Sequence, residues 1–323
     1  MRTLGLRTQI WNNALKSILL LASFPIPLLL MLFGIIVLDK AVEGQAVMPE
    51  LIAAIDRLPL YLPVAVVVAS IWFATAYRIN IWLIKLVSGA KPVTRAQEPR
   101  LYNLLENLCV SRGLAMPKLC LIDSGKLNAF AAGMNPRQYM IAITRGLVDT
   151  LDEAELEAVL GHELSHIRNG DTRLMVVAAV FVGILSLVLD LFGRYARGIG
   201  VLYAIAIACF AVGQLLAVGI RLALSRRREF MADAGAVELT RNPDAVISAL
   251  RKIEGRSTLT DLPTPLRPMY IDSAAEDGFL AGIFATHPTI AERIEALVAY
   301  AGGHEPGPRP AFVLPDALKP GGV

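Results

Sequence analysis

Four long stretches without charged residues most strongly constrain how this chain can fold. A bilayer core of about 30 Å requires roughly 20 helical residues. Residues 17–38, 58–77 and 198–220 reach that length, whereas the stretch that begins at residue 174 is interrupted by Asp190. We therefore expect four transmembrane helices, at about 17–38, 58–80, 174–193 and 198–220.

The composition favours a membrane protein over a soluble one. Hydrophobic residues make up 55% of the chain, charged residues make up 18%, and the mean hydropathy is +0.54, whereas globular proteins average about 25% charged residues. So much apolar material excludes a disordered chain. The three cysteines, an odd number with Cys209 in an apolar stretch, argue against a disulfide scaffold. The net charge of +3 is too small to indicate nucleic-acid binding.

Two other interpretations of the apolar stretches explain less. A buried core helix could account for one stretch, but not for four in one chain. A secretory signal peptide has an apolar core of about 7–15 residues, which the first stretch exceeds. Lys and Arg mark the cytosolic side, and they are concentrated at residues 78–100 and after residue 220. This pattern places both termini and residues 86–172 in the cytosol, in a multi-pass protein of the cytoplasmic (inner) membrane.

The segments outside the apolar stretches are expected to contain both helices and strands. Period-3.6 leucines predict a helix over residues 96–116, and apolar runs predict strands at 118–122, 127–133 and 138–144. A helix is expected from a capping box at Thr150 and Glu153 to the stop signal Asn169-Gly170. Further helices are expected over residues 221–254 and after Pro288. The fold class is therefore mainly α with a small β-sheet, carried on four transmembrane helices.

This pattern divides the chain into five parts. We expect an N-terminal membrane region with two helices, a first cytosolic part, a transmembrane hairpin, a second cytosolic part and a flexible tail rich in proline and glycine. Their bounds are 1–95, 96–172, 173–220, 221–301 and 302–323.

The sequence His162-Glu163-Leu164-Ser165-His166 lies inside the capped helix. Residues four apart share one helical face, so both imidazoles can reach one metal ion. Glu163 projects toward the same cavity and can contact a metal-bound water without occupying a metal position. This is the H-E-x-x-H arrangement of zinc hydrolases. The competing interpretation is a chance match on a surface helix, but two of the four histidines of the chain lie here.

A catalytic zinc usually has three protein ligands and a water. Glu229 can be the third ligand, and Asp233, four residues later on the same face, can accept a hydrogen bond from the far nitrogen of a ligand imidazole. The alternative is a solvated charged helix that follows a membrane span. We attribute the neighbouring Arg226–Arg228 to the positive-inside pattern rather than to catalysis.

These residues together resemble a known family, the HtpX-type integral-membrane zinc metalloproteases, which are relatives of the CAAX prenyl endopeptidases. The resemblance covers most of the chain and includes two N-terminal spans, the H-E-x-x-H motif and two further spans. It also includes Asn128-Ala129-Phe130-Ala131, Ser225-Arg226-x-Arg228-Glu229-Phe230-x-Ala232-Asp233, His287-Pro288 and Arg293-Ile294. Members often show His-Pro-Pro, whereas here Thr289 follows Pro288.

The resemblance implies a zincin-type (gluzincin) α+β catalytic domain and a zinc metalloendopeptidase with one Zn²⁺ per chain, held by His162, His166 and Glu229. Glu163 would be the general base. It also implies cytosolic cleavage of membrane or misfolded proteins, as proteolytic quality control.

Two further segments have more than one interpretation. Asn128, Ala129, Phe130 and Ala131 are similar to the family's strand beside the cleft, where an exposed edge could bind extended substrate by backbone pairing; the alternative is an ordinary core strand. His287 could donate to the oxyanion of the tetrahedral intermediate, or it could simply cap the helix that follows it.

A different class of function also has to be weighed. The zinc could be structural in a non-catalytic adaptor or chaperone, but a structural site has no use for a free carboxylate such as Glu163. A transporter would need ionisable residues in the middle of its spans, and these stretches lack them. We therefore expect an endopeptidase whose partners are membrane-protein or unfolded polypeptide substrates and the lipid bilayer. Nucleic acid is not among them, and a homo-oligomer is left open.

Overall fold

The computed structural model describes residues 47–177, 227–254 and 288–304, together with Trp11, Leu15, Ile18 and Leu19. The helix expected at 17–38, apart from Ile18 and Leu19, the helix expected at 198–220 and the flexible tail beyond residue 304 lie outside the described residues. Of the helix expected at 174–193, only residues 174–177 are described, and they are helical.

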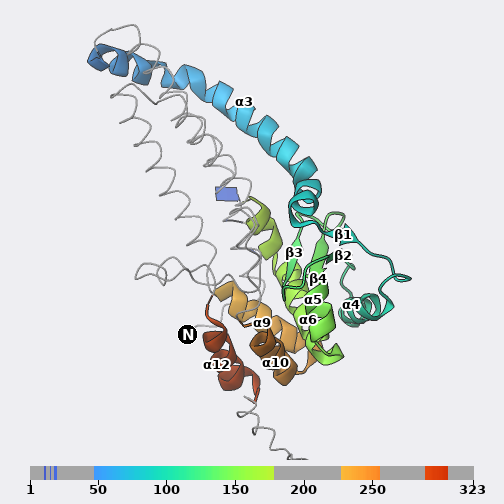
Figure 1. Ribbon diagram of the computed structural model, residues 1–323. Helices are drawn as coiled ribbons and strands as arrows, with labels where there is room; N and C mark the ends of the chain where they lie inside the picture. Colours follow the sequence, from blue (N-terminus) through green and yellow to red (C-terminus); the bar gives the residue numbers. More distant parts are fainter. Residues whose placement is uncertain are drawn as a thin grey trace, which may run out of the picture.

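A long helix, α3 (Val47–Ser88), extends away from the rest of the described chain (Figure 1). It contains the stretch expected to be helical at 58–80. Within the described residues, no single helix is both long and apolar enough to cross a bilayer. Two successive segments, Pro59–Thr75 and Tyr77–Ser88, meet that requirement only as a pair, with a bend of 52° between them.

The sheet is small and mixed. Its strands are β1 (Lys91–Pro92), β2 (Lys118–Ile122), β3 (Ala129–Ala132) and β4 (Met140–Thr144), in the order β1-β2-β4-β3. β2 and β4 are parallel, and the other two pairs are antiparallel. The strand predicted at 118–122 is confirmed to the residue, the other two are shorter than predicted, and β1 was not predicted. Because β3 ends the strand order, one of its edges carries no neighbouring strand of this sheet.

Two helices cover one face of the sheet. The residues of α4 (Pro99–Ser111) and α6 (Glu153–Asn169) join Ile141 and Ile143 of the sheet in one apolar core. The predicted helix 96–116 is shorter in the structure because Pro99 fixes its first turn and Gly113, with φ of 64°, follows its end. This core fixes the orientation of α6 against the sheet.

The predicted start of the metal-motif helix is wrong. Thr150 ends a separate short helix, α5 (Arg145–Thr150), and the capping box of α6 is formed by Asp152 and Glu155. Asp152 Oδ1 accepts a hydrogen bond from the Glu155 backbone N–H at 3.0 Å, and Glu155 Oε2 accepts one from the Asp152 backbone N–H at 2.9 Å. The predicted end is confirmed, since Gly170 adopts a left-handed conformation with φ of 74°.

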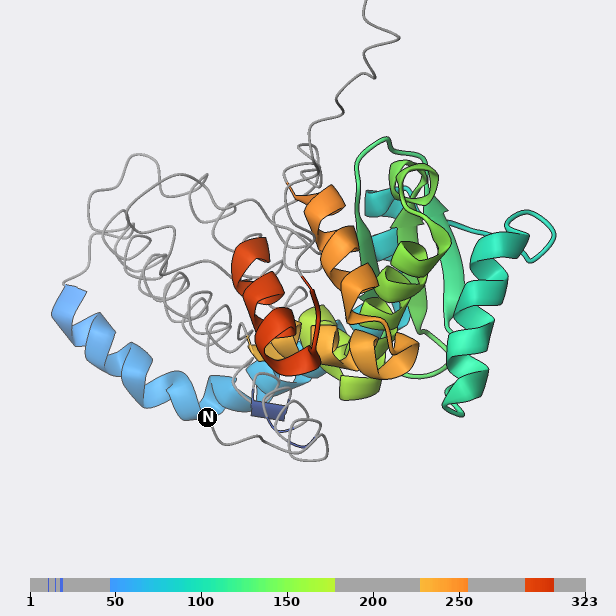
Figure 2. The same ribbon diagram turned by 90° about the horizontal axis from the view of Figure 1, so that it is seen from below.

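Three further helices complete the described part of the chain (Figure 2): α9 (Arg227–Thr240), α10 (Pro243–Ile253) and α12 (Ile290–Ala301). α9 and α10 pack on α6, and α12 packs on α9 and α10. Residues 221–254 were expected to be helical, and the described part, from residue 227 on, forms two helices because the chain breaks between α9 and α10. Asn242 caps α10 by accepting from the Ala245 backbone N–H, and Pro243 occupies its first turn. α12 begins after Pro288, as predicted, with Thr289 and Glu292 as its capping box.

Candidate metal centre

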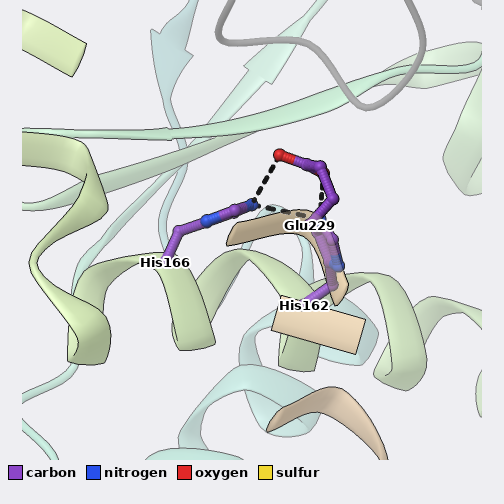
Figure 3. Close-up of side chains that lie close together, drawn as sticks. All are labelled: His162, His166 and Glu229. Carbon is purple, nitrogen blue, oxygen red and sulfur yellow. Dashed lines mark hydrogen bonds and ion pairs between the residues drawn. The ribbon is translucent and has the colours of Figure 1, made fainter. Parts of the chain in front are cut away.

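Three buried side chains from two helices converge on one point (Figure 3). His162 and His166 come from α6 and Glu229 comes from α9, and their ligand atoms lie within 4.8 Å of one another. The Nε2 atoms of the two histidines are 3.1 Å apart. Glu229 Oε2 lies 3.6 Å from His162 Nε2, and Glu229 Oε1 lies 3.8 Å from His166 Nε2.

These distances fit one tetrahedral zinc ion. With metal–ligand bonds of about 2.0–2.1 Å, two ligand atoms on a tetrahedral zinc are roughly 3.3–3.4 Å apart. The three observed separations bracket that value. Two imidazoles and one carboxylate also form the donor set of a catalytic site, which leaves one position for water. The structure therefore brings together the three residues that the sequence analysis assigned as ligands.

An aspartate fixes the orientation of each histidine. His162 donates from Nδ1 to Asp233 Oδ1 and His166 donates from Nδ1 to Asp171 Oδ2, each at 2.9 Å. Both arrangements leave the Nε2 lone pair directed at the metal position. Asp233 lies where the sequence analysis placed it. Asp171 was missed, because its position depends on how the chain turns at Gly170.

A buried arginine from α12 supports this arrangement. Arg293 is 1% exposed and holds Asp233 with two hydrogen bonds, from Nε to Oδ2 at 2.8 Å and from Nη2 to Oδ1 at 2.6 Å. Its Nη1 lies 3.8 Å from Glu229 Oε2. The sequence analysis quoted Arg293 only within the family resemblance. The structure shows that α12 contributes a side chain to the surroundings of the metal position.

The charges around His162 shift the pKa values of this cluster. Burial raises the pKa of Asp233, but the positive charge and hydrogen bonds of Arg293 outweigh that effect and leave the pKa below its usual value. Burial lowers the pKa of His162, but the hydrogen bonds to Asp233 and Glu229 outweigh it and raise this pKa to about 9. A metal ion would therefore have to displace a proton here, as ligand imidazoles must be neutral.

Glu163 lies close to His162, His166 and Glu229 without belonging to the metal set. Its side chain is 2% exposed, and burial raises the pKa of its carboxyl group above the usual value. A backbone hydrogen bond from Ala131 of β3 opposes that shift. The carboxylate is therefore held between the metal helix and the outer strand of the sheet.

β3 has one edge without a neighbouring strand of the described sheet, which we call its free edge. The backbone groups of alternate residues face that edge. The carbonyl of Asn128 accepts from the Thr144 N–H, and the Asn128 N–H donates to Thr144 Oγ1, so these groups face β4. Because alternate residues of an antiparallel pair face opposite edges, the backbone groups of Ala129 and Ala131 face the free edge. The Ala129 N–H there donates to Asn128 Oδ1 at 2.8 Å. The backbone N–H and carbonyl groups of Phe130 face β4, and the residue is 1% exposed.

Two sequence assignments need separate comment. Arg228 was attributed to membrane orientation, but its side chain is only 3% exposed, and its pKa is lowered by burial despite the nearby carboxylates of Asp171 and Glu229. Arg228 is therefore part of the buried surroundings of the site. His287, assigned as an oxyanion donor or a cap, lies outside the described residues and stays a prediction.

Close contact between α6 and α9 controls the distance between the two halves of the metal set. A Cβ atom at Gly235 would lie 2.8 Å from Ser165 Cβ and closer still to its Oγ. We expect Gly235→Ala to force the helices apart, because overpacking a buried contact costs about 1–3 kcal/mol. Zinc affinity, measured by competition with a chelating dye, should fall about tenfold or more, since 1.4 kcal/mol is one decade.

A second substitution distinguishes this packing effect from general damage. Gly235→Ala combined with Ser165→Gly removes both clashing atoms and should restore most of the zinc affinity. The matched control is Gly161→Ala, since a Cβ there would meet its nearest atom at 3.4 Å. An unchanged affinity in Gly235→Ala alone would contradict the prediction.

Arg293→Gln should weaken zinc binding about 10- to 100-fold, the range for losing a group that orients a metal ligand. Without the guanidinium, Asp233 no longer holds His162 in one orientation, and its buried charge loses its partner. Removing one partner of a buried ion pair also costs about 3–5 kcal/mol of stability. Zinc titration and chemical unfolding should be measured together, with Arg251→Gln on the exposed side of α10 as the control. Equal zinc affinities in the two variants would contradict the expected role.

Comparison with known proteins gives matches to one family model, to sequence relatives and to a solved structure. The family model described as "Peptidase family M48" matches residues 95–301. A protein named "Protease HtpX homolog" from Bacteroides fragilis (strain YCH46) is 36% identical over 319 residues, covering 92% of this chain and 99% of that protein. One of the same name from Listeria monocytogenes serotype 4b (strain F2365) is 32% identical over 314 residues, covering 90% and 98%. The crystal structure of S. mikatae Ste24p is 20% identical, with a TM-score of 0.49, covering 89% of this chain and 66% of that one.

Proposed function

The chain belongs to peptidase family M48 and is of the HtpX type, and from that premise we propose that it is a membrane-embedded, zinc-dependent endopeptidase. Its substrates are membrane or misfolded proteins, cut near the cytosolic membrane face as proteolytic quality control. The observation that carries the proposal is the buried Glu163 carboxylate beside the histidine pair, held by the backbone of Ala131. A zinc site that only braced two helices would not need it.

The residues of the chain divide the chemistry among them. A zinc ion held by His162, His166 and Glu229 would act as a Lewis acid and lower the pKa of a bound water toward about 7. Glu163 would take a proton from the water whose oxygen attacks the carbonyl carbon of the peptide bond, and would pass that proton to the amine nitrogen as the C–N bond breaks. Its raised pKa suits this role, because a base that must later act as an acid works best near the operating pH.

The free edge of β3 is the proposed binding surface for the substrate backbone. Ala129 and Ala131 direct their carbonyl groups to that edge. Both residues are buried, at 1% and 3% exposed, so an extended peptide can donate its N–H groups to them only after the edge is uncovered. Ala131 also contacts Glu163, so a peptide paired there lies next to the proposed base. Pairing through the backbone selects little for sequence, which suits unfolded polypeptides as substrates.

Cleavage by the detergent-purified chain tests this proposal. Unfolded casein and a membrane-inserted model protein should both be cut, cleavage should stop with chelator, and added zinc should restore it. If the chain binds one zinc ion and cuts neither substrate, the alternative of a non-catalytic adaptor or chaperone with a structural zinc is favoured.

A further inference from the structure

The two backbone donors that β3 directs to its free edge are already bonded within the chain. The Ala129 N–H donates to Asn128 Oδ1 at 2.8 Å. The Ala131 N–H donates to the carboxylate of Glu163. The other two residues of the strand direct their backbone groups to β4. Both N–H groups of β3 that face the free edge are therefore occupied before any peptide pairs there.

Burial makes both of these hydrogen bonds difficult to exchange. Asn128 and Glu163 are 1% and 2% exposed, and the two alanines that donate to them are also buried. A buried N–H group has to be paired, and a buried acceptor that loses its donor is left with an uncompensated desolvation cost. A peptide carbonyl that took either N–H would break a bond to one of these buried oxygens. We therefore expect both N–H groups to keep their present acceptors.

The position of the Asn128 side chain follows from its backbone. The Asn128 N–H donates to Thr144 Oγ1 at 3.0 Å, and the Asn128 carbonyl accepts from the Thr144 N–H at 2.9 Å. Both backbone groups of Asn128 thus face β4, and its side-chain oxygen reaches the N–H of the next residue on the opposite edge. The occupied donor is therefore built into the start of the strand.

The carbonyl groups of Ala129 and Ala131 face the same free edge, and they determine what a peptide has to supply. In an antiparallel sheet, two residues of a hydrogen-bonded pair exchange two bonds, one in each direction. Here only the bond from the peptide N–H to the strand carbonyl can form, because the reverse donor is occupied. The carbonyl of the paired peptide residue receives no hydrogen bond from β3.

We propose that the free edge of β3, once uncovered, recognises a polypeptide through its carbonyl acceptors alone. This inference rests on the proposed endopeptidase and specifies what its substrates must carry. Two substrate residues, two positions apart, each have to present an N–H group, so proline is excluded at both positions. The peptide carbonyl opposite Ala131 is left unbound by the strand, next to the carboxylate of Glu163.

Backbone replacements in a short fluorescent casein peptide test the proposal by equilibrium binding. The peptide binds the full, zinc-loaded chain that carries Glu163→Gln, whose amide oxygen can still accept from Ala131 and which should leave the peptide uncut. Replacing one N–H at a time by an ester oxygen should weaken binding about tenfold at two positions, two residues apart, since each loss leaves a buried strand carbonyl without its donor. Replacing the carbonyl of either residue, with an alkene in place of the following peptide bond, should leave binding unchanged.

The matched variants of the protein are Asn128→Ala and Asn128→Asp, each combined with Glu163→Gln. Asn128→Ala frees the Ala129 N–H, so the alkene replacement opposite Ala129 should now weaken binding about tenfold. Asn128→Asp keeps a side-chain oxygen at this place and should remain insensitive to the alkene. Sensitivity to the alkene with Asn128 in place, or an unchanged response in Asn128→Ala, would overturn the proposal. The peptide series with Asn128 in place decides the question even if Asn128→Ala does not fold.

The same series separates this inference from the proposed function. If the parent chain cuts neither casein nor the peptide, the endopeptidase is contradicted, whereas two ester-sensitive positions in binding would still support an edge that only accepts hydrogen bonds. If the parent chain cuts the peptide and ester replacements are tolerated at every position, the endopeptidase stands and the acceptor edge is overturned.

Discussion

Glu163→Gln is expected to retain one zinc ion per chain and to lose proteolysis by about 10²–10⁴-fold, the usual contribution of a general acid–base group. The amide has nearly the same shape as the carboxylate but cannot accept a proton from water. Glu163 is not among the three residues that converge on the metal position, so the zinc content of the variant should be unaffected. Metal analysis and the cleavage rate, measured on the same preparation, check both expectations.

The control for this variant is Glu153→Gln in the first turn of the same helix, where the side chain is 73% exposed. That variant should cleave like the parent chain. Activity of Glu163→Gln within tenfold of the parent would remove Glu163 as the base. Self-cleavage during purification without chelator, if the parent shows it, should disappear in Glu163→Gln.

The parts of the site that could be predicted are those set by local geometry. His162 and His166 share a face because they are four residues apart on one helix, and the same spacing relates Glu229 to Asp233. Asp171 and Arg293 could not be placed in this way. Their roles depend on how the chain turns at Gly170 and how α12 packs on α9, which no short pattern encodes.

The errors in secondary structure have identifiable causes. The capping box predicted at Thr150 and Glu153 is not formed, and Asp152 and Glu155 form it instead. Glu155 also accepts hydrogen bonds from Ser248 Oγ and Lys252 Nζ of α10, each at 2.6 Å, so tertiary contacts select that start. The break before α10 had a local signal in Asn242-Pro243, which disfavours a continuous helix.

For Arg228 the sequence interpretation was wrong in another way, because the positive-inside rule was applied to a residue that is buried. Basic residues after an apolar stretch often mark the cytosolic side, but this one is buried beside Asp171 and Glu229. The charge pattern along a sequence does not reveal which members of a cluster turn inward.

Glu229→Ala should have the largest effect on the metal itself. We expect zinc affinity to fall by more than about 100-fold, because loss of a group that merely supports a ligand already costs 10–100-fold. The two histidines would remain on α6 with their aspartate partners, so weak residual binding is expected, and cleavage at limiting zinc should be lost. Competitive zinc titration followed by cleavage at saturating zinc separates binding from chemistry.

The comparison for this variant is Glu254→Ala, which removes an exposed carboxylate just after α10. It should bind zinc like the parent chain. Wild-type affinity and cleavage in Glu229→Ala would mean that the third ligand comes from elsewhere. That outcome would also separate α9 from the metal centre, although Glu229 lies within 3.6–3.8 Å of both ligand histidines. A large loss in Glu229→Ala alone would instead show that α6 and α9 must both be in place for the chain to hold its metal.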